Sequence, residues 1–502
     1  MLRTLSLCGA LFIAAGANAA DLISLFPIED YDQNVADFVD ASAPDYNQPL
    51  LSPAQQNQRM QEFYSHYFSS SGEDRSPWNE TYVDLFYNAA PPYDLKSTEL
   101  SIIAWLSNKG KSASAIGYGE NFRPHTDAWI DAIQSNMNLD QFSGSTYSAA
   151  HRGITVINLS GRALPTNDPH FYSYKLPGQG YPFDNDQETA VWAGTPVYVA
   201  GVSLDGKWDL VISPDVLTWV HSDGVAYTDE NFVTTWQNAA ARQLAAITAT
   251  ATPIVDQKNH FHFSAYVGSV FPVRMSSNGK TNIMIPSMDK HHMAVVDSAV
   301  LPASAFARMP LTPSAHQFAN LIETLQGRPY GWGNYNFYND CSAETKSLMT
   351  PFGIYLARHS SAQINSGKVV DESAASRDQR ISYLLQNGHK FMTIVYIGGH
   401  VFLYIGNTQN YSSDGSPMIY QSIWGLSPAD YSRRAVIGET VLFPLLAQYP
   451  EDPSLVSLAS KKYFQVSYLD QQPAQQYHKG LSEMQLRAFM LPEGMLEHDL
   501  DR

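Results

Sequence analysis

A stretch of short strand-like runs between Tyr174 and Thr228 constrains the fold of this chain more than any other feature. The segment AVWAGTPVYVAGVSLDGKWDLVISPDVLTWVHSDGVAYT alternates β-branched and aromatic residues with turns of Gly, Asp and Pro. Its LDGKW sequence is typical of a β-hairpin, because Asp-Gly tolerates the positive φ of a tight turn. A second β-rich stretch, from Thr252 to Phe306, contains the alternating runs HFHFSAYVGSVFPVRM and TNIMIP. The spacing predicts two small β-barrels in tandem.

Helical patterns precede and follow this β-rich region. In residues 21–169, ELSIIAWLSNKG and HTDAWIDAIQSNMNLDQF place apolar residues at helical spacing, whereas RGITVINLSG alternates like a strand. Further on, TPSAHQFANLIETLQG predicts a helix that Thr312 or Ser314 caps and Gly327 ends. The strand-like runs MTIVYIGG, HVFLYIG and PMIYQSIWG come after it. A helix followed by an antiparallel sheet indicates an α+β domain.

These changes of pattern divide the chain into six parts, and the fold class that we expect is α+β multidomain. In order, the parts are a signal peptide (1–20), a mixed N-terminal domain (21–169), a first small β-barrel (170–232), a second small β-barrel (233–308), an α+β domain (309–448) and a C-terminal extension (449–502). The extension is polar and rich in Gln, and its composition indicates no role.

The first residues, MLRTLSLCGALFIAAGANAA, have the pattern of a signal peptide. Arg3 supplies the positive start, an apolar run follows, and residues 17–19 have the small-x-small form of a cleavage site. A lipoprotein anchored through Cys8 is the alternative, but Leu7 is too large for that processing pattern. No apolar run reaches the roughly 20 residues of a membrane span. We therefore expect an exported protein of the periplasm or cell envelope, without a membrane span.

Charge and cysteine content narrow the partners and the chemistry. The formal net charge of −17 and the pI near 5.2 argue against nucleic acid or anionic lipid as a partner. The chain has two cysteines, Cys8 and Cys341, so removal of a signal peptide would leave Cys341 alone. A lone cysteine in an exported protein is a reactive thiol, part of an intermolecular bridge or an inert buried side chain. The neighbouring residues must decide between these.

The sequence around Cys341 favours a nucleophile. Asn339 or Asp340 is a good helix N-cap, which places the thiol in the first turn of a helix, near the positive end of its dipole. That position lowers the pKa of a thiol below its usual value of about 8.5 and favours the thiolate. His400 in GGHVFLYIG is the candidate general base, and Gln421 in the next strand is placed to orient its imidazole if the two strands pair.

Together with its flanking motifs, this region resembles the NlpC-type cell-wall cysteine peptidases, a compact branch of the papain-like fold. The family pattern is a helix followed by four motifs, which read here Pro329-Tyr330-Gly331-Trp332-Gly333, Asp340-Cys341-Ser342, Gly353-Ile354-Tyr355-Leu356-Ala357-Arg358-His359-Ser360 and Gly399-His400-Val401. Upstream, TPVYVAGVSLDGKWDLVISPDVLTWV is similar to a bacterial SH3-type domain, and the second β-rich stretch to another. YGENFRP and RALPTNDPHF are similar to the domain that precedes such SH3 pairs. The resemblance thus covers nearly the whole mature chain.

The resemblance implies hydrolysis of the bond from γ-D-glutamate to the diamino acid, usually meso-diaminopimelate, in peptidoglycan stem peptides, with no cofactor. It makes Cys341 the nucleophile, His400 the general base and Gln421, where the family most often has His, the third member of a triad. The Cys341 backbone N–H and the Tyr330 hydroxyl would face the oxyanion. An arginine fork, Arg358, would suit the free carboxylate of D-glutamate. Other positions assigned to the substrate are Trp332, Asp340, Ser342, His359 and Ser360.

His359 departs from the family pattern. Close relatives that trim free stem peptides carry Asp at this position, where it helps to bind the N-terminal ammonium of the substrate. A histidine is neutral or positive near neutral pH and cannot form that pair. The sequence therefore predicts tolerance for stems still joined to the glycan, unless an acidic group of the first SH3-like domain reaches the same place.

Other histidines and other functions must be weighed against this interpretation. Four histidines could supply zinc ligands: His260, His262, His291 and His292. No cysteine accompanies them, so we interpret them as surface or turn residues and expect no metal site. A non-catalytic cell-wall scaffold is a second possible function, against which the intact Cys341 and His400 argue. Amidase or acyltransferase chemistry with the same thiolate is a third, and it differs from the first in pocket shape.

Overall fold

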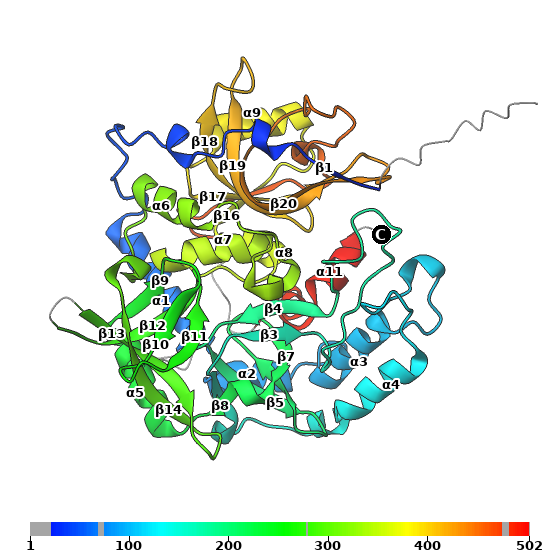
Figure 1. Cartoon of the computed structure of the whole chain (residues 1–502), viewed down its shortest axis with the longest axis vertical. Coiled ribbons are helices and arrows are strands. Elements are labelled where there is room, and N and C mark those ends of the chain that lie inside the picture. The colour runs from blue at the N-terminus through cyan, green and yellow to red at the C-terminus, as the bar shows by residue number, and fades with distance from the viewer. Residues whose placement is uncertain (1–21, 69–74, 278–279, 474–480, 501–502) are drawn as a thin grey trace, which may run out of the picture.

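The computed structural model describes residues 22–68, 75–277, 280–473 and 481–500. The expected signal peptide and Cys8 lie outside these ranges. Figure 1 shows the C-terminal α+β domain at the top, the second β-rich domain at lower left, and the first β-rich domain at lower centre with α3 and α4 to its right. Within the described ranges, no helix has the length and apolarity needed to cross a bilayer.

Four α-helices form the N-terminal region, and each begins at a polar N-cap. They are α1 (Pro53–Tyr67), α2 (Glu80–Tyr87), α3 (Leu95–Leu106) and α4 (Asp127–Asn136). The cap side chains, which accept hydrogen bonds from backbone N–H groups of the first turn, belong to Ser52, Asn79, Asp94 and Thr126. The two helices expected from ELSIIAWLSNKG and HTDAWIDAIQ are confirmed as α3 and α4.

The first β-rich domain is a seven-stranded sheet with the order β4-β3-β7-β6-β5-β2-β8. Its strands are β2 (Arg152–Thr155), β3 (Leu159–Arg162), β4 (Gln187–Val191), β5 (Pro196–Val202), β6 (Trp208–Ile212), β7 (Leu217–His221) and β8 (Val225–Tyr227). The LDGKW hairpin is confirmed, because it joins β5 to β6 with Gly206 at φ +69°. β2 and β3 precede residue 170, so the sheet takes in sequence that we expected to end the N-terminal domain.

The second β-rich domain begins with α5 (Glu230–Arg242) and continues as strands. These are β9 (Leu244–Ile247), β10 (Thr252–Val255), β11 (Phe261–Ala265), β12 (Val270–Ser277), β13 (Lys280–Met288), β14 (Ala294–Leu301) and β15 (Phe306–Arg308). Five of them form a sheet with the order β14-β13-β12-β9-β15, and β10 pairs with β11.

The C-terminal domain packs helices against a seven-stranded sheet, as the α+β pattern predicted. Its helices are α6 (Ala315–Leu325), α7 (Cys341–Met349), α8 (Ser360–Gln363) and α9 (Arg377–Asn387). The sheet order is β1-β20-β19-β18-β17-β21-β16, with β1 (Ile23–Leu25), β16 (Lys368–Asp371), β17 (Thr393–Tyr396), β18 (Val401–Thr408), β19 (Ser416–Leu426), β20 (Arg434–Pro444) and β21 (Gln465–Tyr468). Ser314, rather than Thr312, caps α6. β1 and β21 lie outside residues 309–448, so both ends of the chain contribute to this sheet.

A shared core fixes α7 against the central strands of this sheet. Leu348 and Met349 of α7 are buried in the same apolar cluster as Leu403 of β18 and Tyr420 of β19. Each fully buried large apolar side chain contributes about 1.5–3 kcal/mol to stability. Helix α7 is therefore held close to β18 and β19, and the other two members of the predicted triad lie next to or within these strands.

The C-terminal extension is part of the folded structure. Its helices α10 (Glu483–Met490) and α11 (Glu493–Leu500) pack against the core shared by the N-terminal helices and the first β-rich domain. Met490 is 1% exposed, Leu491 is 8% exposed, and the ring centroids of Phe489 and Phe86 lie 4.8 Å apart. At about 1.5–3 kcal/mol for each buried apolar side chain, detaching this segment would cost several kcal/mol. Its polar composition gave no sign of this docking.

Candidate active site

Cys341 is the first residue of α7. The Asp340 side chain, rather than that of Asn339, caps the helix by accepting a hydrogen bond from the Ala343 N–H at 2.9 Å. Cys341 is 5% exposed, and it forms no disulfide with any described residue. The thiol therefore belongs to the first turn of a nine-residue helix, near the positive end of its dipole, as the sequence predicted.

His400 and Gln421 form a pair on adjacent strands. His400 directly precedes β18, Gln421 lies within β19, and the His400 Nε2 is 2.7 Å from the Gln421 Oε1. The amide oxygen can only accept a hydrogen bond, so Nε2 carries the proton and Nδ1 is left as the basic nitrogen. Gln421 is 1% exposed, which holds the imidazole in one orientation. The expected pairing of the two strands is confirmed, with Leu403 opposite Tyr420.

The environment of His400 keeps its imidazole neutral. Burial lowers its pKa from the ordinary value of 6.5 to about 4, against a smaller opposing effect of the hydrogen bond to Gln421. At neutral pH the ring is therefore in its unprotonated, neutral form.

Asp340 connects the start of α7 to its surroundings. Besides capping the helix, its carboxylate accepts hydrogen bonds from the Ser342 hydroxyl at 3.1 Å and from the Gly333 N–H at 3.1 Å. The Arg358 guanidinium donates to both carboxylate oxygens, at 3.2 and 2.5 Å. These buried groups form one network that fixes the loop before the nucleophile.

Arg358 makes several contacts that the sequence did not indicate. The residue is 2% exposed, and its guanidinium also donates to the Ser342 hydroxyl at 2.7 Å and to the Thr189 hydroxyl on β4 at 2.9 Å. Its contacts join the nucleophile loop to the first β-rich domain.

A small pocket borders Cys341. Its wall is formed by Asn185, Gln187, Glu188, Tyr330, Trp332, Gly333, Asp340, Cys341, Gly399, Glu493 and Gly494. Tyr330 and Trp332 are therefore pocket residues, as predicted, and the Trp332 ring lies edge-on to Phe183 at 5.3 Å. Gly333, at φ +59°, leaves the space that the Gln187 backbone occupies, since a Cβ there would lie 2.3 Å from the Gln187 carbonyl oxygen.

Two of the carboxylates in this pocket were not found from the sequence. Glu188 comes from β4, and burial raises its pKa well above the ordinary value of 4.5. Glu493 comes from the start of α11, where it accepts hydrogen bonds from the Ser360 N–H and hydroxyl at 3.0 and 2.7 Å. The only available signal for Glu493 was Pro492 before it, which is typical of a helix start but does not predict where the helix docks.

His359 and Ser360 lie beside this second carboxylate. The His359 Nδ1 is 3.5 Å from the Glu493 Oε2, and His359 is buried. The backbone N–H and the hydroxyl of Ser360 both donate hydrogen bonds to the Glu493 carboxylate. The carboxylate that Ser360 binds here is therefore one from the chain itself.

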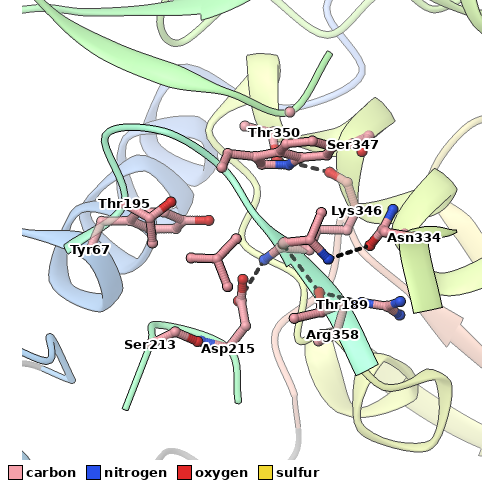
Figure 2. Close-up of a pocket in the computed structure, with 15 residues that line it drawn as sticks. Tyr67, Thr189, Thr195, Ser213, Asp215, Asn334, Lys346, Ser347, Thr350 and Arg358 are labelled. Carbon is pink, nitrogen blue, oxygen red and sulfur yellow. Dashed lines mark hydrogen bonds and ion pairs between the residues drawn. The ribbon is translucent and has the colours of Figure 1, made fainter. Parts of the chain in front are cut away.

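A second cavity lies between α7 and the two β-rich domains. Figure 2 shows Lys346 of α7 directed toward Asp215, with their charged atoms 2.8 Å apart. The Lys346 ammonium also donates to the Leu356 carbonyl at 2.7 Å, and burial lowers its pKa. Thr189 and Arg358 border the same cavity (Figure 2). The cavity thus marks a polar junction between α7 and the first β-rich domain.

The histidines weighed as zinc ligands divide between two places. His260 and His262 both approach Asp256, at 3.2 and 3.6 Å, and Asp297 lies close to this group. His291 and His292 are exposed and lie in the turn before β14. Contact with Asp256 accounts for the positions of the first two, and we assign no metal to them.

The lowered pKa of His400 predicts a loss of stability in mild acid. As the pH falls, the unfolded chain takes up a proton near 6.5, whereas the folded chain does so only near 4. The neutral ring therefore leaves the free energy of unfolding at its full value above pH 6.5. The free energy of unfolding decreases as the pH falls from 6.5 toward 4. We expect the melting temperature of His400→Gln to decrease less than that of the wild type between pH 6.5 and 4.5.

His291→Gln, which changes an exposed ring, is the control and should keep the wild-type slope. The buried His66 and His170 also have lowered pKa values, so His400→Gln should remove only part of the acid sensitivity. Equal slopes for His400→Gln and the wild type would contradict a buried neutral imidazole.

Known proteins resemble this chain in three of its domains and in its fold. Residues 5–142 match the N-terminal NLPC_P60 stabilising domain, residues 169–221 an SH3 domain of SH3b1 type, and residues 229–277 an SH3 domain of SH3b2 type. No curated protein sequence matches the chain. Among solved structures, an NlpC/P60 endopeptidase from Photobacterium damselae subsp. piscicida is 28% identical with a TM-score of 0.75, over 90% of this chain and 99% of that one.

An NlpC/P60 family protein from Bacillus cereus ATCC 10987 is 16% identical with a TM-score of 0.42, over 61% of this chain and 98% of that one. The domain matches and the Photobacterium structure agree with the fold described above. This chain therefore has the N-terminal stabilising domain of NlpC/P60 proteins followed by two bacterial SH3b domains, and its fold matches that of an NlpC/P60 endopeptidase.

Proposed function

We propose that this protein is an exported cysteine endopeptidase that hydrolyses the bond from γ-D-glutamate to the diamino acid, usually meso-diaminopimelate, in peptidoglycan stem peptides. The observation that carries the proposal is the pair of His400 and Gln421 on strands that pack against α7, the helix that begins at Cys341. The SH3b domains and the likeness to an NlpC/P60 endopeptidase support a cell-wall substrate.

The first half of the proposed reaction forms a thioester. The Cys341 sulfur attacks the γ-carbonyl carbon of D-glutamate, and its proton passes to the Nδ1 of His400. The carbonyl oxygen becomes an oxyanion, with the Cys341 N–H and the Tyr330 hydroxyl as the proposed donors. The C–N bond then breaks, His400 returns the proton to the departing amine of the diamino acid, and the acyl group stays on sulfur.

The second half releases the acyl group. His400 takes a proton from water, the hydroxide oxygen attacks the thioester carbon, and the C–S bond breaks. The products are the γ-carboxyl group of D-glutamate and the regenerated thiol, which recovers its proton from His400. Gln421 holds the Nε2–H side of the ring throughout, so that Nδ1 serves both steps.

Mass spectrometry of stem peptides after incubation with the protein tests this proposal. The wild type should release a fragment that ends in D-glutamate and one that begins with the diamino acid. Cys341→Ala and His400→Ala should abolish release, and Gln421→Ala should slow it by less than His400→Ala, because an orienting residue contributes less than the base itself.

Circular dichroism should show that the variants remain folded. Release of intact stem peptide from its muramic acid would instead indicate an amidase. Unchanged peptides with every substrate would favour a non-catalytic wall-binding protein.

The structure alters the expected substrate state. The sequence predicts tolerance for glycan-linked stems unless an acidic group reaches the place of His359. Glu493 lies beside His359, and Glu188 lines the same pocket as Glu493. Glu188, on the first SH3b domain, fits the acidic group that the sequence interpretation left open. Because burial raises the pKa of Glu188, a cationic ligand group would stabilise its ionised form. We therefore propose a preference for stems with a free N-terminal ammonium.

A comparison of two substrates tests the role of Glu188. The free L-Ala-γ-D-Glu-diaminopimelate peptide should be cleaved faster than the same stem carrying muramic acid. In Glu188→Gln the ratio of the two kcat/KM values should fall about tenfold, which corresponds to about 1.4 kcal/mol. Glu323→Gln, at an exposed position of α6, should keep the wild-type ratio. A preference for the glycan-linked stem in the wild type would refute this role.

A further inference from the structure

The C-terminal segment reaches the pocket that contains the nucleophile. Figure 1 shows α11 between the upper sheet and the lower right part of the molecule, next to β4. Glu493 and Gly494, at its start, line the same pocket as Cys341. Residues more than 150 positions after Cys341 thus form one wall of the pocket. Contacts of Glu493 join this wall to the loop from Arg358 to Ser360.

The Glu493 carboxylate is tightly held there. One oxygen accepts both hydrogen bonds from Ser360, and the other lies 3.5 Å from the His359 Nδ1 and 3.9 Å from an Arg358 nitrogen. Its side chain is 15% exposed. These neighbours lower the pKa of Glu493 to about 2 despite its burial, so the group is ionised at neutral pH.

The chain is anchored on both sides of Glu493. Before it, Met490 and Leu491 are buried in the core of the N-terminal helices and the first SH3b domain. After it, Gly494 packs so closely that a Cβ would lie 3.3 Å from the Trp105 ring. The backbone of this segment could therefore leave the pocket only if buried apolar residues were pulled out of a core. This argues for a permanent wall and against a plug that leaves when substrate arrives.

We propose that the C-terminal segment is a permanent wall of the active-site pocket. In this wall, Glu493 is a positioning residue that holds Ser360 and places a fixed negative charge in the pocket that contains the thiol. The charge disfavours anionic groups on this side of Cys341. The expected effect of Glu493 on turnover rests on the proposed function. The expected effect of Glu493 on the thiol is independent of that function, because alkylation of Cys341 needs no substrate.

Alkylation tests the charge directly. In the full-length protein, the rates of modification by iodoacetate and iodoacetamide are measured from the mass of the peptide that contains Cys341. With both reagents the thiolate sulfur bonds to the CH₂ carbon and displaces iodide, but only iodoacetate is anionic. Glu493→Gln should raise the iodoacetate-to-iodoacetamide rate ratio at least threefold, whereas Glu323→Gln should leave it unchanged.

Steady-state kinetics test the positioning role. Glu493→Ala should lower kcat/KM for the stem peptide at least tenfold, mainly through KM, because Ser360 loses its acceptor. Glu493→Gln, whose amide oxygen can still accept from Ser360, should remain within threefold of the wild type. Melting temperatures of both variants show whether the segment stays docked, and Glu493→Gln keeps the test valid if the Ala variant fails to fold.

The possible outcomes separate the inference from the proposed function. An unchanged alkylation ratio in Glu493→Gln would overturn the inference even if the wild type cleaves stem peptides. Faster cleavage by Glu493→Ala would also overturn it, since that is the behaviour of a plug. Failure of the wild type to cleave any stem peptide would refute the proposed function, while the alkylation ratio would still decide the charge of the wall.

Discussion

The buried carboxylate of Asp340 is the group on which the candidate site depends. It caps the helix that begins at Cys341, binds the Gly333 N–H and receives two hydrogen bonds from Arg358. A buried charge of this kind is stable only while its partners are present, and removal of one partner of such a pair typically costs about 3–5 kcal/mol. The position of the nucleophile, the shape of the preceding loop and the orientation of Arg358 are therefore set together.

The same network makes the pocket a property of the whole chain. Arg358 extends it to Thr189 of the first SH3b domain, and Lys346 of α7 is paired with Asp215 of that domain. On another side, Glu493 ties the C-terminal segment to Ser360. Parts of the chain that lie far apart in sequence thus supply walls around a thiol, and the proposed base and orienting group come from the central strands of one sheet.

Local chemistry made much of this predictable from the sequence. The cap before Cys341, the strand that starts after His400 and the LDGKW turn each follow from two to five neighbouring residues, and the structure has all three. Long-range contacts were not predictable. Nothing in the sequence near Arg358 indicates that its guanidinium donates to Asp340, Ser342 and Thr189.

The two missed carboxylates have the same explanation. Glu188 is one acidic residue within a strand, and Glu493 lies in a segment whose composition resembles a solvated tail. Their places depend on the packing of β4 against the nucleophile loop and of α10 and α11 against the N-terminal helices. The sequence specifies that packing through apolar residues such as Met490 and Leu491, which give no indication of which carboxylate comes to lie at the pocket.

Detection of the acyl-enzyme is the most direct test of the central claim, that Cys341 acts as a nucleophile assisted by His400. The protein is mixed with a stem peptide, quenched in acid within the first turnover and digested, and the peptide that contains Cys341 is weighed by mass spectrometry. The account predicts that this peptide gains the mass of the acyl fragment ending in D-glutamate, less one water, and that hydroxylamine removes it as expected for a thioester. Cleavage without such an adduct, with the adduct on another residue, or by a Cys341→Ala variant would contradict it.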